Sequence, residues 1–139
     1  MEISGEAALP VAPGRVRSAL RDPALLARLV DAPALTPFGP GRWRGTVVVG
    51  APPLAQRHAV LLRLASADDD LAFELVEEGR SDGLSITGRC RLEEVRRGAT
   101  CLRYHVRARL GGVAGLLGGG AIRRLIDDFF TTLAKELSG

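Results

Sequence analysis

The feature that most constrains the fold of this chain is a pair of alternating segments joined by a tight turn. Residues Leu84–Val95 and Thr100–Leu110 flank the turn pair Arg97-Gly98. Every second residue in them is apolar or small: Leu84, Ile86, Gly88, Cys90 and Leu92, then Leu102, Tyr104, Val106, Ala108 and Leu110. A period of two predicts an antiparallel hairpin with one covered face and one solvated face.

Further strand-like segments precede this hairpin and are separated by glycine, proline or aspartate clusters. They are Met1–Leu9, a segment ending at Phe38, Arg42–Val49, Leu54–Leu64 and Leu71–Glu77. This regular spacing of turn signals is typical of an antiparallel meander. We therefore expect one curved antiparallel sheet of about seven strands.

Helical spacing appears in three places. Two short helices are expected after the first strand, over Arg15–Arg21 and after the cap and N1 proline at Asp22-Pro23. A long amphipathic helix is expected over Ile122–Leu137, and counted from Gly112 it would reach about 26 residues, or about 39 Å. The sheet must curl around this last helix to bury both apolar faces. The prediction is one α+β domain, residues 1–139, of the helix-grip class.

Composition excludes several classes of function. The net charge is only +3 and aromatic residues make up 4%, which argues against a nucleic-acid partner. No stretch is long and apolar enough to span a bilayer, and the first ten residues carry Glu2 and Glu6 but no basic residue. We therefore expect a cytoplasmic protein. Cys90 and Cys101 fit no metal spacing, and strand parity places them on opposite faces, which disfavours a disulfide.

The chain resembles a known family over nearly its whole length, and its C-terminal part is the most specific. The opening Met1-Glu-Ile-Ser-Gly-Glu, the later Leu20-x-Asp22-Pro23 and the closing Asp128-Phe129-Phe130 are similar to the CoxG family of carbon monoxide dehydrogenase proteins. That family belongs to the START-like (SRPBCC) helix-grip superfamily. The resemblance implies a carrier of quinone or another lipid, serving an oxidoreductase of the molybdenum hydroxylase class at the membrane. This chain departs from the family at Asp31-Ala32, where a Pro-Gly pair is usual.

We expect an apolar ligand cavity between the sheet and the last helix. Strand parity and helical spacing predict its lining as His58, Val60, Leu62, Phe73, Leu75, Ile86, Cys90, Tyr104, Val106, Ile122, Ile126, Phe129 and Phe130. The alternative is that these side chains simply fill a core. Small inward residues at Gly45, Gly88 and Ala108 favour an open volume.

A glycine-rich run connects the last strand to the last helix. Six of the thirteen residues from Leu110 to Ile122 are glycine, and neither a P-loop nor a dinucleotide fingerprint is present. One interpretation is a lip over the cavity that touches a membrane surface through Val113, Leu116 and Leu117. The other is a plain connection that packs closely on the sheet.

Polar side chains support binding better than catalysis. His58 and Tyr104 are the inward polar residues that parity indicates, and His58 has three interpretations: general base, contact to a ligand carbonyl, or core histidine. The outward arginines of the last two strands suggest either an anionic partner or cross-strand pairs with Glu2, Glu6, Glu74 and Glu78. We predict a non-enzymatic carrier with no cofactor, metal or catalytic residue. The alternatives are a membrane adaptor for an oxidoreductase and a cyclase- or hydrolase-like enzyme.

Overall fold

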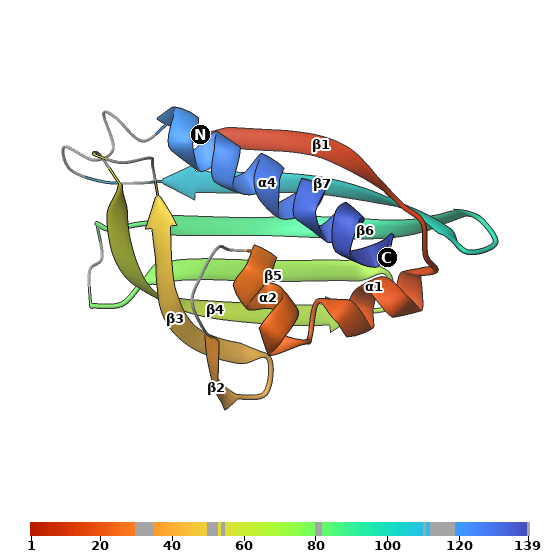
Figure 1. The fold of residues 1–139 in the computed structure, drawn as a ribbon, viewed down its shortest axis with the longest axis horizontal. Helices are drawn as coiled ribbons and strands as arrows, with labels where there is room; N and C mark the ends of the chain where they lie inside the picture. Colours follow the sequence, from red (N-terminus) through yellow and green to blue (C-terminus); the bar gives the residue numbers. More distant parts are fainter. Residues whose placement is uncertain are drawn as a thin grey trace.

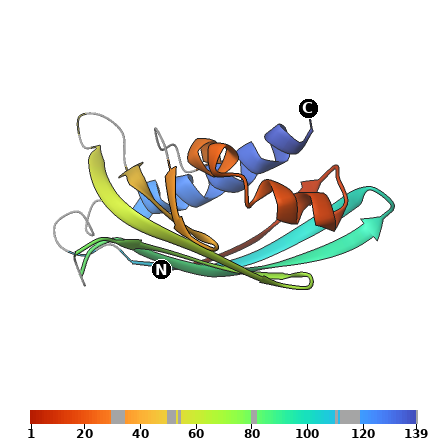
Figure 2. The ribbon, with the colours of Figure 1, turned by 90° about the horizontal axis from the view of Figure 1, so that it is seen from below.

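The computed structural model describes residues 1–29, 35–49, 53, 55–79, 82–109, 111 and 119–138. One antiparallel sheet of seven strands forms one layer, and helices cover one of its faces (Figures 1 and 2). None of the helices in the described ranges combines the length and the hydropathy that a membrane span requires.

The strands follow the predicted segments closely. They are β1 (Glu2–Leu9), β2 (Leu35–Gly39), β3 (Arg42–Val49), β4 (Gln56–Ala67), β5 (Asp70–Glu77), β6 (Ser85–Arg96) and β7 (Ala99–Arg109). Their order in the sheet is β1-β7-β6-β5-β4-β3-β2. The meander therefore runs from β2 to β7, and β1 pairs with β7 to extend it at the far edge (Figure 1).

The predicted hairpin of the last two strands is confirmed. Gly98 has a φ of 77° at the turn, a value that glycine adopts without strain. Cys90 pairs in register with Tyr104, and Leu92 pairs with Leu102. Cys90 is buried, and both it and Cys101 are free thiols.

In the described ranges, three helices lie on the inner face of the sheet. They are α1 (Pro13–Ala19), α2 (Pro23–Leu29) and α4 (Gly119–Leu137). The first begins and ends two residues before the predicted Arg15–Arg21, because Pro13 already fits the first helical turn. Asp22 Oδ1 accepts a hydrogen bond from the Ala24 N–H at 3.0 Å, as a cap should. The described part of the last helix has 19 residues, and the predicted extension over 112–118 lies outside the described residues.

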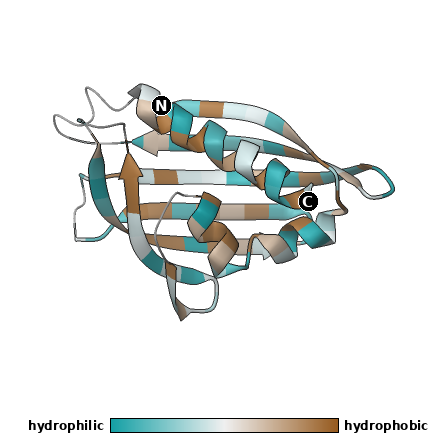
Figure 3. Ribbon diagram, in the orientation of Figure 1, coloured by the Kyte–Doolittle hydropathy of each residue, from teal (hydrophilic) through white to brown (hydrophobic). Residues whose placement is uncertain are grey.

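The core lies between the sheet and these helices. Apolar and polar residues alternate along each strand, so that one face of the sheet is buried and the other is wet (Figure 3). Val16 on α1, Leu26 on α2 and Leu133 on α4 are all almost fully buried against it. The predicted α+β helix-grip class is therefore confirmed: a curved seven-stranded antiparallel sheet around a C-terminal helix, with two short helices after the first strand.

Candidate functional site

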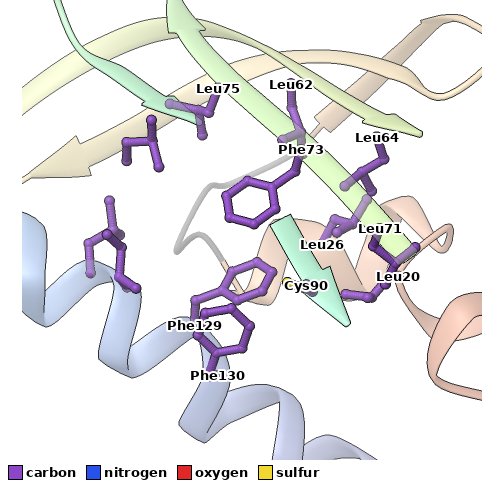
Figure 4. A pocket seen from close by; sticks show the side chains of 13 residues that line it. Leu20, Leu26, Leu62, Leu64, Leu71, Phe73, Leu75, Cys90, Phe129 and Phe130 are labelled. Atoms are coloured by element: carbon purple, nitrogen blue, oxygen red, sulfur yellow. The ribbon is translucent and has the colours of Figure 1, made fainter. Parts of the chain in front are cut away.

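A cavity of about 60 Å³ lies between the sheet, the two short helices and α4 (Figure 4). All its lining side chains are apolar or thiol: Leu20, Leu26, Leu62, Leu64, Leu71, Phe73, Leu75, Ile86, Cys90, Leu125, Ile126, Phe129 and Phe130. One water molecule needs roughly 10–15 Å³ on this scale, so the volume equals that of a few waters. Such a space favours an apolar group over water, because it offers water no hydrogen-bond partner from a side chain.

The cavity brings together much of the predicted lining. The predicted residues that line it are Leu62, Phe73, Leu75, Ile86, Cys90, Ile126, Phe129 and Phe130. The other predicted residues lie outside this lining: His58, Val60, Tyr104, Val106 and Ile122. Strand parity, and helical spacing for Ile122, placed all of these on the inner side, and four of them are buried while Tyr104 packs against the core. Parity cannot decide which inward residues surround an unfilled space.

The expectation that small inward residues leave empty space is wrong at one of the three positions, Gly88. A Cβ on Gly88 would lie 2.5 Å from Cζ of Phe73, so the Phe73 ring already fills that position. Gly5 is likewise covered by the Tyr104 hydroxyl. At Gly5 and Gly88 the missing side chain therefore makes room for an aromatic residue and leaves no empty space.

Residues from the short helices complete the cavity and were absent from the predicted lining. Leu20 lies at the C-cap of α1 and Leu26 lies in α2, and both line the cavity. Their helical spacing predicts burial but gives no direction toward the cavity. Leu64, Leu71 and Leu125 also line it. Strand parity predicts Leu71 to face inward together with Phe73 and Leu75, and the same period of two extends to Leu64.

A second hollow, of about 430 Å³, lies beside the cavity, between the C-terminal end of α1, the β2–β3 hairpin and the β4–β5 hairpin. It shares Leu20, Leu64 and Leu71 with the cavity lining. Arg17 and Arg21 are among its lining residues. Arg17 pairs with Asp69 at 3.0 Å, and Arg21 donates a hydrogen bond to the Ser66 hydroxyl. We call these two contacts the arginine latch. They hold α1 to the hairpin at the side of the cavity that this hollow adjoins. The predicted lip residues Val113, Leu116 and Leu117 lie outside the described residues.

A buried polar pair lies on the same inner face. His58 Nδ1 is 2.6 Å from Oε1 of Glu77, and the two side chains are 7% and 8% exposed. The same oxygen accepts a hydrogen bond from the Leu84 N–H at 3.1 Å. Glu77 was absent from the predicted site, although parity with Phe73 and Leu75 places it inward. The inward polar residues are therefore not limited to His58 and Tyr104.

The ring of Tyr104, rather than its hydroxyl, makes the main described contact in the interior. The ring stacks on that of Phe130, with centroids 3.9 Å apart. Burial raises the pKa of the Tyr104 hydroxyl above its ordinary value. Burial also raises the pKa of the Cys90 thiol, to about 12. Neither group is prepared to lose a proton near neutral pH. The described residues contain no cluster of three or more potential metal ligands.

Cross-strand pairs account for part of the arginine-rich outer face. Arg103 pairs with Glu6 at 3.3 Å, and Arg107 pairs with Glu2 at 3.2 Å. The Arg107 contact, with His105 nearby, lowers the pKa of the Glu2 carboxyl. Glu78 was expected to pair with the arginines of the last two strands. Instead, Oε1 of Glu78 lies 2.6 Å from Nε of Arg44 on β3. In the sheet, β4 lies between β3 and β5.

A shallow hollow of about 460 Å³ lies on the same outer face. Arg63, Arg89 and Arg107 surround it, together with Glu74. Ala65 and Ala72 line it as well, and their short side chains leave it hollow. Acidic side chains on the neighbouring strands pair with arginines of this face, as Glu2 on β1 does with Arg107 and Asp70 on β5 does with Arg91. This surface is therefore mixed in charge rather than a single cationic patch.

Comparison with known proteins supports the fold. The chain is similar to a conserved protein from Geobacillus kaustophilus, with a TM-score of 0.85 and 21% identity over 99% of this chain and 95% of that chain. It is similar to the Zhui aromatase/cyclase from Streptomyces, with a TM-score of 0.70 and 13% identity over 99% and 93% of the chains. A START superfamily protein from Mycobacterium smegmatis matches with a TM-score of 0.69 and 12% identity over 98% and 93%.

No protein-family model matches the sequence, and no curated protein matches it. At these identities the similar structures define the fold alone. The chain therefore has the START-like helix-grip fold, as the resemblance implied.

Proposed function

We propose that this protein is a non-enzymatic carrier that holds a hydrophobic ligand between its sheet and α4. The observation that carries this proposal is a cavity lined entirely by apolar and thiol side chains. Each 100 Å² of apolar ligand surface buried there would contribute about 2.5 kcal/mol before ordering costs. A carrier needs only this desolvation, together with a route by which the ligand enters and leaves.

The ligand class we propose is a quinone or another isoprenoid or acyl lipid. A volume of about 60 Å³ is well below that of a typical drug-sized site, roughly 300–1,000 Å³. Binding a whole ligand therefore requires the lining to move apart. Leu64, Phe73, Leu125 and Phe129 are only half-buried in this lining, so they are the side chains that a ligand would displace first. The proposed route by which the ligand enters and leaves is the second hollow, beside α1 and the arginine latch.

The finer proposal concerns the partner. The resemblance to the CoxG family supports delivery of quinone to an oxidoreductase of the molybdenum hydroxylase class, with the carrier cytoplasmic and peripheral at the inner face of the membrane. An adaptor that recruits such an enzyme, with an incidental cavity, is the alternative from the same resemblance. Loss of recruitment in a variant whose cavity is blocked would favour the carrier over the adaptor.

A cyclase- or hydrolase-like enzyme is the second candidate, and one observation favours it. The buried His58–Glu77 pair has the arrangement of an oriented general base. An enzyme would alter the ligand that it binds, whereas a carrier returns it unchanged. The mass of the ligand extracted before and after long incubation at working temperature therefore separates the two functions.

Two measurements test the carrier proposal directly. Native mass spectrometry followed by organic extraction should detect a co-purifying lipid. Trp43, the single tryptophan of the chain, is buried and pairs in register with the lining residue Leu62. Its fluorescence should be quenched by 2-methyl-1,4-naphthoquinone bound in the cavity, and oleic acid should compete.

Variants make this test specific to the cavity. Cys90→Leu and Leu75→Phe each add bulk to the lining and should weaken quenching about tenfold or more. Val95→Leu is the matched control, since Val95 is 60% exposed. No co-purifying lipid together with no quenching would contradict the proposal, as would blocked variants that bind like the wild type.

A further inference from the structure

We propose that His58, held in place by Glu77, is the polar anchor of the ligand site. Its Nε2 atom accepts a hydrogen bond from a hydroxyl group on an otherwise apolar ligand. This inference rests on the proposed carrier function and adds to it a ligand class: phenols, hydroquinones or long-chain alcohols, in preference to ethers and hydrocarbons of the same shape.

The first support is a buried polar atom with no partner. Besides Glu77, whose side chain is 8% exposed, two polar residues are buried among those that the structure describes, His58 and Thr100. Thr100 satisfies its hydroxyl by donating to the Val11 carbonyl at 2.7 Å. Within the part of the chain that the structure describes, His58 Nε2 has no hydrogen-bond partner, although buried polar atoms almost always have one. A ligand hydroxyl would supply it.

The second support is the proton arrangement that Glu77 imposes. Oε1 of Glu77 accepts the Leu84 N–H and lies 2.6 Å from His58 Nδ1. A carboxylate can only accept, so Nδ1 carries the hydrogen in this contact. In the neutral imidazole the other nitrogen then has a free lone pair. In this neutral form Nε2 is an acceptor, which suits a ligand hydroxyl better than the carbonyl contact considered from the sequence alone.

The third support is the position of the pair relative to the cavity. Glu77 follows the lining residue Leu75 by two positions on β5 and faces the same way. Two residues of an antiparallel strand span about 7 Å. On β4, His58 precedes Leu62 by four positions, which is about 14 Å. An apolar tail in the cavity and a hydroxyl at His58 therefore suit one elongated molecule.

The experiment compares two probes that differ in one group. Isothermal titration calorimetry would measure 4-hexylphenol and its methyl ether, 4-hexylanisole, against the full chain. The wild type should bind the phenol about tenfold more tightly than the ether, since only the phenol can donate a hydrogen bond. In His58→Asn the amide can still donate to Glu77, but the Nε2 position is lost. We expect this variant to bind both probes equally.

Three further variants separate anchoring from a structural role. His58→Gln reaches the Nε2 position and should restore part of the preference for the phenol. His105→Asn changes the exposed histidine of the outer face and should leave the preference intact. Trp43→Phe removes the indole Nε1, the other buried side-chain polar atom that has no hydrogen-bond partner among the described residues. This variant should also leave the preference intact.

The outcomes distinguish the inference from the function on which it rests. Equal binding of both probes by the wild type would overturn the anchor and leave the carrier proposal standing. A preference that disappears in Trp43→Phe but survives in His58→Asn would also overturn it. Failure of the wild type to bind either probe would overturn the anchor and count against the carrier proposal.

Discussion

The ring of Tyr104 on β7 stacks on the ring of Phe130 on α4, with centroids 3.9 Å apart and planes within 10° of parallel. Phe129 meets Phe130 edge to face at 5.1 Å and lines the cavity. The stack therefore holds the helix against the sheet at one wall of the cavity. Aromatic pairs of this kind contribute about 0.5–1.5 kcal/mol beyond the area that they bury.

This stacking predicts that removal of the Phe130 ring lowers the free energy of unfolding strongly, whereas removal of the Tyr104 hydroxyl lowers it little. Phe130→Ala should lower the free energy of unfolding by about 3–5 kcal/mol, because it removes a buried ring and leaves a void. Tyr104→Phe keeps the stack and should cost about 1 kcal/mol or less. Urea unfolding checks both, with Phe38→Ala, on a ring that is 43% exposed, as the control. Equal costs for Phe130→Ala and Phe38→Ala would contradict this account.

We predict that the Phe73 ring, which covers Gly88, leaves no room for a side chain at this position. A Cβ there would crowd Phe73 Cζ at 2.5 Å and the His105 carbonyl oxygen at 3.0 Å, so Gly88→Ala should cost about 1–3 kcal/mol of stability. In the Phe73→Leu background part of this cost should disappear, giving a coupling free energy of about 1 kcal/mol. Gly120→Ala, where a Cβ meets nothing within 4 Å, is the matched control. Additive costs in the double mutant would rule out the contact as the cause.

The Cys90 thiol predicts a loss of stability at high pH. Its pKa rises from 9.0 to about 12 on folding because burial disfavours the thiolate. The protonated thiol contributes fully to the free energy of unfolding below pH 9. Above pH 9 the thiol of the unfolded chain ionises while the buried thiol does not, and this stabilises the unfolded state. Stability should then fall by roughly 1.4 kcal/mol per pH unit until the folded thiol also ionises. Chemical unfolding at several pH values should show a shallower slope for Cys90→Ala, and parallel curves would refute the assignment.

The arginine latch is predicted to control the rate of ligand exchange more than affinity. Removing Arg17 and Arg21 together frees α1 from the β4–β5 hairpin. Exposed pairs of this kind are each worth about 0–1 kcal/mol, so release of bound 2-methyl-1,4-naphthoquinone should accelerate about two- to tenfold. Stopped-flow fluorescence of Trp43 would measure it. Arg28→Ala, which breaks the exposed pair with Glu136 at 3.3 Å, should leave the rate unchanged, and an equal effect there would exclude the latch.

Part of the candidate site could be predicted from the sequence and part could not. Glu77 could have been predicted as an inward residue, because it continues the alternation of Phe73 and Leu75. Its contact with His58 could not, since the two residues lie 19 positions apart and meet through the turn between β4 and β5. Leu20 and Leu26 were predictable as buried but not as part of the cavity lining.

The sequence by itself determined the strands, the turns, the short helices and the side of the sheet that each residue faces. These follow from local periodicity and from glycine and proline, which act over a few residues. Only the tertiary structure decided where space remains. The volume depends on how α1, α2 and α4 cross the sheet and on which rings settle over glycines, as Phe73 does over Gly88. Close packing makes that outcome a property of all the side chains together rather than of any one segment.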